Sequence, residues 1–262
     1  MPTMVIGEND GFKIEDKLLN LINERVFKDI DPIIQEQLIS ISSNISIGDY
    51  FQTSKKTRKG LEKKTDLFVL KNSEKFCNLS IKSGTGNSVH QESIYEFVKF
   101  LHSKGSTCKE TNPLLFFHWG DTSLDGLTGE KDITKRMSGE IIKKKYPDVI
   151  SQLNKLFKKY KTDIIKRVLI GSEDGMEPTH ILYATNLNLN EIYISSIQKI
   201  LKFHEDINLV SEKYVLVGNM TFQNQHRCLQ GQEKLKGKKK KKRTDIQFKW
   251  NLYEDIKGLH GK

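Results

Sequence analysis

The sequence predicts a mixed α/β protein, because two kinds of hydrophobic pattern alternate along the chain. Apolar residues recur at helical spacing from Lys13 to Ile30, and a lysine-rich helical stretch runs from Ile133 to Lys161. Short apolar runs of strand length also occur, such as Leu67 to Leu70 and His180 to Ala184. With 262 residues, 36% of them hydrophobic, the chain is long and apolar enough to bury a core. We therefore expect a sheet flanked by helices.

The N-terminal third contains two predicted helices, a loop and a hairpin. The first helix covers Lys13 to Ile30, and a second helix, which begins with a proline, covers Pro32 to Ile41. The stretch from Gly48 to Gly60 is polar and basic, which predicts a connecting loop. The apolar runs Leu67 to Leu70 and Phe76 to Ile81 are separated by the polar stretch KNSEK, which indicates a β-hairpin.

The rest of the chain continues the alternation. The stretch SGTGN ends the hairpin, and apolar spacing from Ser88 to Gly105 predicts a helix. The run LLFFHW, from Leu114 to Trp119, predicts a buried strand, and Pro147 interrupts the helical stretch that follows. We further expect a strand over 180–184, a helix near 192–204, a strand over 213–223 and a final strand over 245–250. The sequence contains no internal repeat and no Pro- or Ser-rich linker.

The positive charge of the chain is concentrated in one short segment. The net charge is +10, and the run from Lys236 to Arg243 carries seven lysine and arginine residues, which leaves the remainder at only +3. Such a run predicts a local segment that grips the phosphates of a polyanionic partner. The alternative interpretation is a solvated lysine-rich loop.

The cysteines and the N-terminus favour a cytoplasmic location. Cys77, Cys108 and Cys228 are far apart and form no CxxC pair, so neither a disulfide framework nor a zinc site is expected, and a reducing compartment fits best. The N-terminus lacks a basic start followed by an apolar run, and no stretch approaches the roughly 18 apolar residues of a membrane span. We therefore expect no membrane partner.

The open end of the hairpin gathers residues suited to phosphodiester cleavage. Asp66 opens the first strand, while Ser80 and Lys82 end the second strand and point to the same face. Antiparallel pairing of the strands brings Asp66 beside Lys82. Cleavage of a phosphodiester requires a metal held by hard oxygen ligands and, usually, a cation beside the attacking water. In a chain with 29% charged residues, however, an ordinary surface hairpin also produces such a pair.

This arrangement resembles the PD-(D/E)XK nuclease core, in which an acidic residue starts one strand and a (D/E)xK triplet ends the next. The matching segments are KTD, from Lys64 to Asp66, and SIK, from Ser80 to Lys82, so that Ser80 replaces the acidic residue of the triplet. The segments GFKIED, RVLIGSEDGMEPTHILYA and DIQFKW are similar, in the same order, to parts of small type II restriction endonucleases. The resemblance implies a central mixed sheet flanked by helices and Mg²⁺-dependent cleavage of double-stranded DNA.

The resemblance also implies roles for individual residues. In some members a serine stands in the triplet and a glutamate from the following helix supplies the missing carboxylate, for which Glu92 and Glu96 are the candidates, with Glu92 favoured. Glu15 in the first helix is a further candidate ligand. Asp66 and Glu92, with Glu15, would thus hold Mg²⁺, while Lys82 orients the attacking water and Ser80 forms a hydrogen bond within the site.

Several polar and basic residues are candidates for DNA contacts. Cations and exposed amides suit phosphates, and glutamine or asparagine side chains suit base edges. The candidates are Lys64, Asn87, His90, Gln91, Gln225, Arg227, Lys236, Lys241, Arg243, Gln247 and Lys249. A capping role, a polar turn or simple exposure to water would explain the same residues. A palindromic target would require a homodimer, and a monomer that makes successive nicks is the alternative.

By function, we expect the chain to divide into two parts. Residues 1–161 form a nuclease core, which contains the N-terminal helices and the catalytic hairpin 65–82. Residues 162–262 form a DNA-recognition part that is continuous with the same fold. Two other functions remain open. One is a repair or nicking nuclease with the same core, which prefers damaged or structured DNA. The other is a non-catalytic basic protein that binds nucleic acid, in which Asp66 and Lys82 form a plain surface pair.

Overall fold

A computed structural model describes residues 10–55, 64–83, 88–120, 137–171, 175–209, 211–223 and 245–260. The chain forms two compact units, each built from separate segments. Unit 1 comprises Met1–Asn87, Leu169–Phe203 and Asn251–Lys262, and unit 2 comprises Ser88–Val168 and His204–Trp250. The division at residue 161 concerns function and stays a prediction. In the described part, no helix is both long and apolar enough to cross a membrane.

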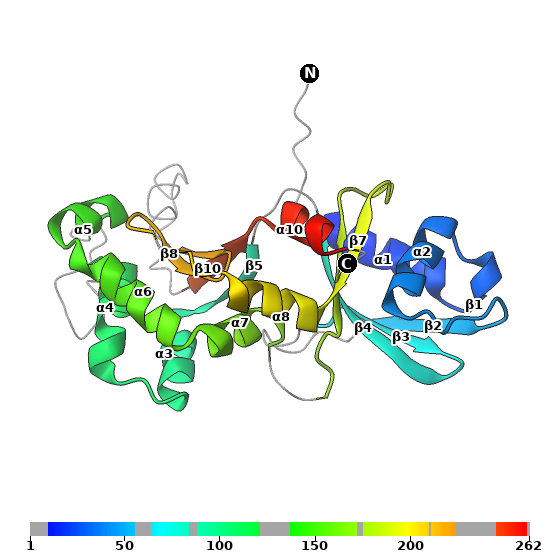
Figure 1. Ribbon diagram of the computed structural model, residues 1–262, viewed down its shortest axis with the longest axis horizontal. Coiled ribbons are helices and arrows are strands. Elements are labelled where there is room, and N and C mark those ends of the chain that lie inside the picture. Colours follow the sequence, from blue (N-terminus) through cyan, green and yellow to red (C-terminus); the bar gives the residue numbers. More distant parts are fainter. Residues whose placement is uncertain are drawn as a thin grey trace, which may run out of the picture. The chain divides into compact units, whose positions relative to one another are not determined.

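Unit 1 is built on a six-stranded mixed sheet with the strand order β1-β2-β3-β4-β6-β7 (Figure 1). Its strands are β1 (Arg25–Val26), β2 (Tyr50–Lys55), β3 (Leu67–Lys71), β4 (Glu74–Ser83), β6 (His180–Ala184) and β7 (Ile192–Ser196). Only the pair β4 and β6 is parallel, and the other neighbours are antiparallel. The helices of this unit are α1 (Asp10–Ile22), η1 (Phe27–Asp29), α2 (Pro32–Ile41) and α10 (Leu252–Leu259), while α8 (Ile197–Asp206) begins here and ends in unit 2.

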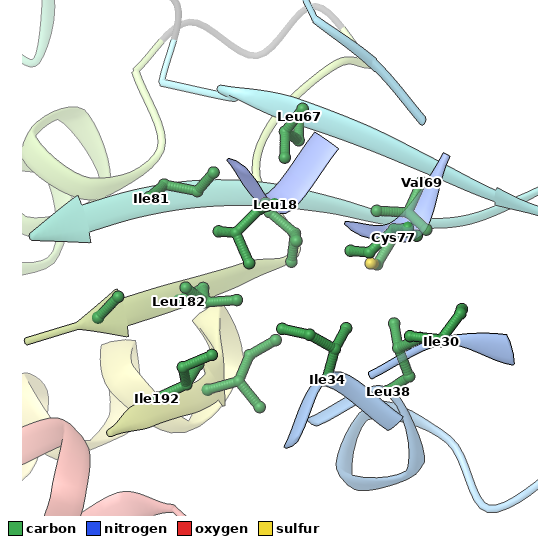
Figure 2. Close-up of a cluster of buried hydrophobic side chains, with 14 of the residues drawn as sticks. Leu18, Ile30, Ile34, Leu38, Leu67, Val69, Cys77, Ile81, Leu182 and Ile192 are labelled. Atoms are coloured by element: carbon green, nitrogen blue, oxygen red, sulfur yellow. The ribbon is translucent and has the colours of Figure 1, made fainter. Parts of the chain in front are cut away.

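The core of unit 1 lies between the sheet and helices α1 and α2. In α1, Ile14, Leu18 and Ile22 follow one another at four-residue spacing and are all buried, so one face of the helix is apolar. Figure 2 shows Leu18, together with Ile34 and Leu38 of α2, turned toward strand residues that include Leu67, Ile81 and Leu182. Leu79 and Ile81 belong to this cluster, so the residues that alternate with them on β4, Ser80 and Lys82, belong to the opposite face.

Unit 2 is built on a four-stranded antiparallel sheet with the order β5-β10-β9-β8. Its strands are β5 (Ser88–Ser93), β8 (Val215–Val217), β9 (Met220–Gln223) and β10 (Asp245–Trp250). Its helices are α3 (Ile94–Ser103), α4 (Cys108–Trp119), α5 (Gly139–Lys145), α6 (Asp148–Lys159) and α7 (Lys161–Leu169). The last residue of α7 is assigned to unit 1. Phe97, Phe157, Phe222 and Phe248 contact one another with ring centroids 5.2 to 6.5 Å apart. These rings join α3 and α6 to the sheet.

Several sequence predictions are confirmed. The hairpin forms as β3 and β4, the strands over 180–184 and 245–250 form as β6 and β10, and the helix break at Pro147 separates α5 from α6. Asp31 caps α2 through its side chain, which accepts from the backbone N–H of Ile33, and Pro32 occupies the first turn.

The buried strand predicted over Leu114 to Trp119 is wrong, because these residues form the second half of α4. Thr107 and Glu110 build a capping box at the start of this helix, and Gly120 ends it in the left-handed conformation. Leu114 to Trp119 are all buried, so no polar face reveals the helical period in the sequence.

Five further elements differ from the prediction. The loop predicted over 48–60 contains β2, the helix predicted from Ser88 begins only at Ile94 after β5, and the helix predicted near 192–204 is β7 followed by α8. The strand predicted over 213–223 is the hairpin of β8 and β9, which turns at Gly218 with a φ of 56°. The first helix ends at Ile22 rather than Ile30. Strand pairing, which hydrophobic spacing alone does not reveal, accounts for the strands among these differences.

Candidate functional site

Asp66 lies at the open end of the hairpin, directly before β3. Its backbone N–H donates to Leu79 O at 2.8 Å, and its carboxylate Oδ2 accepts from the backbone N–H of Ile81 at 2.7 Å. The ladder between β3 and β4 has its last pair at Leu67 and Leu79, so the side chain of Asp66 takes the place of the next backbone partner. The carboxylate is thereby fixed at the end of the hairpin.

Ser80 and Lys82 connect to this carboxylate through hydrogen bonds. Lys82 Nζ donates to Ser80 Oγ at 2.9 Å and to Ile81 O at 3.3 Å, and Ser80 Oγ is 3.5 Å from Asp66 Oδ2. Ser80 is buried and Lys82 is half-buried. The expected proximity of Asp66 and Lys82 is therefore present, with the hydroxyl of Ser80 between them.

Glu15 provides a second carboxylate in unit 1. It is buried on α1, a helix that packs on β2 and β4, and its Oε2 is 3.8 Å from Lys55 Nζ at the end of β2. Lys55 also contacts the exposed carboxylate of Asp16 at 2.5 Å. Glu15 thus belongs to the same unit as Asp66, as a candidate metal ligand should.

Glu92 lies on β5 in unit 2, directly before Ser93, the N-cap residue of α3. Its Oε2 accepts from Arg167 Nη2 at 2.6 Å and from Arg167 Nε at 3.1 Å, while its Oε1 accepts from Arg167 Nε at 2.9 Å and from His90 Nε2 at 2.7 Å. Burial alone would raise the pKa of Glu92, but the hydrogen bonds and charges of His90 and Arg167 outweigh it and hold this pKa below its usual value. Both carboxylate oxygens are therefore engaged by donors within unit 2.

Glu96, the other candidate on the segment after the hairpin, lies in the first turn of α3. It is exposed and pairs with Lys99 at 2.8 Å, three residues along the helix. This is an ordinary solvated surface pair.

The donor set at the hairpin end suits a hard cation in kind. Mg²⁺ prefers oxygen ligands, and Asp66 Oδ, Ser80 Oγ and the Ile81 carbonyl lie together there. Among the described residues, no three His, Cys, Asp or Glu side chains form a group that could hold a metal ion. A metal ion at this site would therefore have few carboxylate ligands from the protein. Hydroxyl, carbonyl, water or phosphate oxygens would supply its other ligands.

A second candidate surface is the outward face of the unit 2 sheet. Gln247 on β10 pairs with Gln91 on β5 and with Gln223 on β9, so three glutamines form one row across adjacent strands. We call this surface, with Ser88, Thr221, Asp245 and Lys249, the glutamine face. Each of these seven residues is at least partly exposed, whereas Ile246, Phe248 and Trp250, which alternate with them on β10, are buried. Gln247 and Lys249 therefore face away from the apolar side of β10.

Hydrogen bonds order the glutamine face. Gln91 Nε2 donates to Asp245 Oδ2 at 2.9 Å, and Gln247 Nε2 donates to Ser88 Oγ at 2.8 Å. Gln223 joins the row through the pairing of β9 with β10, which the sequence does not show. Its position at the end of an alternating buried and exposed strand is the one sequence signal that could have indicated it.

The remaining candidates for DNA contact differ in their placement. His90 is buried against Phe248, with ring centroids 6.3 Å apart, and bonds to Glu92, so it faces the interior of unit 2. Lys64 is half-buried just before Asp66. Asn87, Gln225, Arg227, Lys236, Lys241 and Arg243 lie outside the residues that the structure describes.

No protein-family model matches the sequence, and no curated protein matches it either. Among solved structures, the chain is similar to restriction endonuclease MspI in complex with its cognate DNA, with a TM-score of 0.60 and 13% identity. The match covers 95% of this chain and 93% of that chain. At this identity the likeness concerns the fold, so the chain has a restriction-endonuclease-like fold, a mixed α/β architecture with a central mixed sheet flanked by helices, as the sequence predicted.

Proposed function

We propose that this protein is a type II restriction endonuclease of the PD-(D/E)XK kind, which hydrolyses phosphodiester bonds of double-stranded DNA with Mg²⁺. The observation that carries the proposal is the connected set Asp66, Ser80 and Lys82 at the end of the hairpin. The likeness to the fold of a restriction endonuclease supports it. A carboxylate at this position can hold a metal ion, and a lysine connected to it can stabilise the charge that develops on a phosphate.

This proposal assigns a role to each residue of the site. Asp66, with Glu15, would hold Mg²⁺, which when bound neutralises phosphate charge and activates water. Lys82 orients the attacking water and stabilises the negative charge that develops on the phosphate. Ser80 accepts a hydrogen bond from Lys82 and thereby keeps the ammonium group near Asp66. The water oxygen bonds to phosphorus, the bond to one sugar oxygen breaks, and solvent takes the water proton and protonates the leaving oxygen.

The glutamine face would supply part of the sequence readout. A glutamine amide can donate to and accept from an adenine edge at once, and a lysine can contact guanine. Gln91, Gln247 and Lys249 stand on this face, and Gln225 and Arg227 would contribute from the segment that follows Gln223. Lys236, Lys241 and Arg243 would grip phosphates, which set the position of the protein on DNA without reading sequence. A homodimer would match a palindromic site.

Plasmid cleavage tests the proposal. Wild-type protein is incubated with plasmid DNA, with Mg²⁺ or with EDTA, beside the variants Asp66→Ala and Lys82→Ala. Glu74→Ala and Lys75→Ala, exposed residues at the turn end of the same hairpin, are the matched controls. We expect discrete Mg²⁺-dependent fragments in the wild type and both controls, and none in the two site variants.

Other outcomes identify the alternatives. Binding without cleavage under every condition would leave a non-catalytic nucleic-acid-binding protein. Cleavage of damaged or structured DNA in preference to a fixed site would indicate a repair or nicking nuclease with the same hairpin.

A further inference from the structure

Glu92 is held in a triad with His90, which is buried like Glu92, and Arg167, which is half-buried. Arg167 binds the carboxylate through Nε and Nη2, a two-point contact that fixes the relative orientation of both groups. Its guanidinium carbon also lies 4.6 Å from the centre of the Phe100 ring, which holds the cation in place from another side. Arg167 belongs to α7 and Glu92 to β5, so the triad joins a helix to the edge of the unit 2 sheet.

The triad lies directly behind the glutamine face. Among the strands that the structure describes, β5 lies at the edge of its sheet and has β10 as its neighbour. His90 and Glu92 are buried, and Gln91 between them is exposed on the opposite face. An edge strand has backbone hydrogen bonds on one side alone, so its other restraints come from its buried side chains. The position of Gln91 in the glutamine row therefore depends on how firmly Glu92 and His90 are held.

We infer that Glu92, Arg167 and His90 are positioning residues for DNA readout by Gln91 and the glutamine face, and that Glu92 is not a metal ligand. The inference rests on the proposed function. It follows from the two-point ion pair, which occupies both oxygens of Glu92, and from the opposite orientation of Gln91 on the same strand. In some proteins an ion pair taken out of water in this way fixes one conformation, and this is the role that we assign to the pair of Glu92 and Arg167.

A Mn²⁺ titration of the DNA-free protein tests the metal part. We expect Glu92→Gln and the exposed control Glu96→Gln to bind Mn²⁺ like the wild type, while Asp66→Ala and Glu15→Gln bind it about tenfold or more weakly. Weaker binding by Glu92→Gln than by Glu96→Gln would overturn the inference, since Glu92 would then hold the metal.

Duplex binding in EDTA tests the positioning part without cleavage. The measured quantity is the ratio of the Kd values for a duplex with a scrambled site and one with the site that the wild type cuts. We expect Arg167→Met to lower this ratio about tenfold and to leave binding of the scrambled duplex unchanged. Lys166→Met, an exposed neighbour on α7, loses the same charge and should keep the wild-type ratio. A wild-type ratio in Arg167→Met would overturn the inference.

The double variant Glu92→Leu with Arg167→Met separates positioning from folding, because apolar replacement of a whole buried ion pair commonly restores stability. We expect its Tm to return toward the wild-type value while the ratio of Kd values stays low. Recovery of both quantities would show that the triad only stabilises the fold and would contradict a positioning role. If the wild type bound the two duplexes equally well, the proposed function itself would be refuted, which is distinct from a failure of the positioning role.

Discussion

The backbone N–H of Ile81 donates to Asp66 Oδ2 at 2.7 Å, so this carboxylate both ends the hairpin ladder and stands in the candidate active site. One residue therefore serves stability and chemistry, and the two contributions can be separated by substitution.

Asp66→Asn should separate them. The amide oxygen still accepts from Ile81, so we expect the free energy of unfolding to change by less than about 1 kcal/mol. Loss of the negative charge should lower DNA cleavage by a factor of about 100 or more. Asp66→Ala should also lose about 1–3 kcal/mol of stability, because a backbone donor loses its partner. Urea unfolding and plasmid cleavage, measured on the same preparations, check both expectations.

Ser80 and Lys82 should act as one unit. Ser80→Ala removes the nearer of the two acceptors of Lys82 Nζ, and we expect a decrease in cleavage rate of about tenfold, smaller than that of Lys82→Ala. In Ser80→Ala/Lys82→Ala the two losses should not add, because the serine acts through the lysine. Single-turnover rates of the four proteins measure this coupling, and strictly additive losses would refute it.

Gln247→Ala should weaken sequence readout, because Gln247 is the centre of the glutamine row. Loss of one base contact by a glutamine amide costs about 1–3 kcal/mol of discrimination. Binding of a scrambled duplex should remain as in the wild type. Gln152→Ala, an exposed glutamine on α6, is the control, and the relative Kd for site and scrambled duplexes is the measurement.

His204 should make stability depend on pH. Burial lowers the pKa of this histidine from 6.5 to about 3, so the unfolded chain binds a proton more readily than the folded chain. The contribution of neutral His204 to the free energy of unfolding is fully present above pH 6.5. It is lost as the pH falls from 6.5 toward 3, at up to about 1.4 kcal/mol per pH unit. His204→Asn keeps an acceptor for the backbone N–H of Asn219 and carries no charge. Urea unfolding between pH 8 and 5 should show a flatter pH dependence for this variant, whatever its stability at pH 8.

Asn154 should protect the edge of the unit 2 sheet. From α6, its amide donates to Tyr214 O at 3.3 Å and to Ser211 O at 2.9 Å, and its oxygen accepts from Leu216 N–H at 3.2 Å. One side chain thus stands where a further strand beside β8 would bind. Asn154→Leu leaves these backbone groups without that partner. We therefore expect the free energy of unfolding to fall by about 1–3 kcal/mol and the protein to self-associate more strongly. Thermal unfolding with light scattering checks this, with Ser151→Ala on the same helix as the control.

The sequence by itself determined the hairpin and the proximity of Asp66, Ser80 and Lys82 at its open end. Asp66, Ser80 and Lys82 are brought together by a short turn and by the two-residue period of a strand, and both rules act locally. Local sequence also explains the correct prediction of β6 and β10, because each is a short apolar or alternating segment of the length of a strand. It also explains the error at Leu114 to Trp119, since a segment buried on every side shows no period.

Only the tertiary structure decided which residues share a surface or a partner. Glu92 meets Arg167 across 75 residues, and the two side chains form an ion pair that no local pattern indicates. Gln91, Gln247 and Gln223 form a row because β10 pairs with β5 on one side and β9 on the other. Such pairings depend on the summed packing of two sheets and their helices, and no spacing along the chain encodes them.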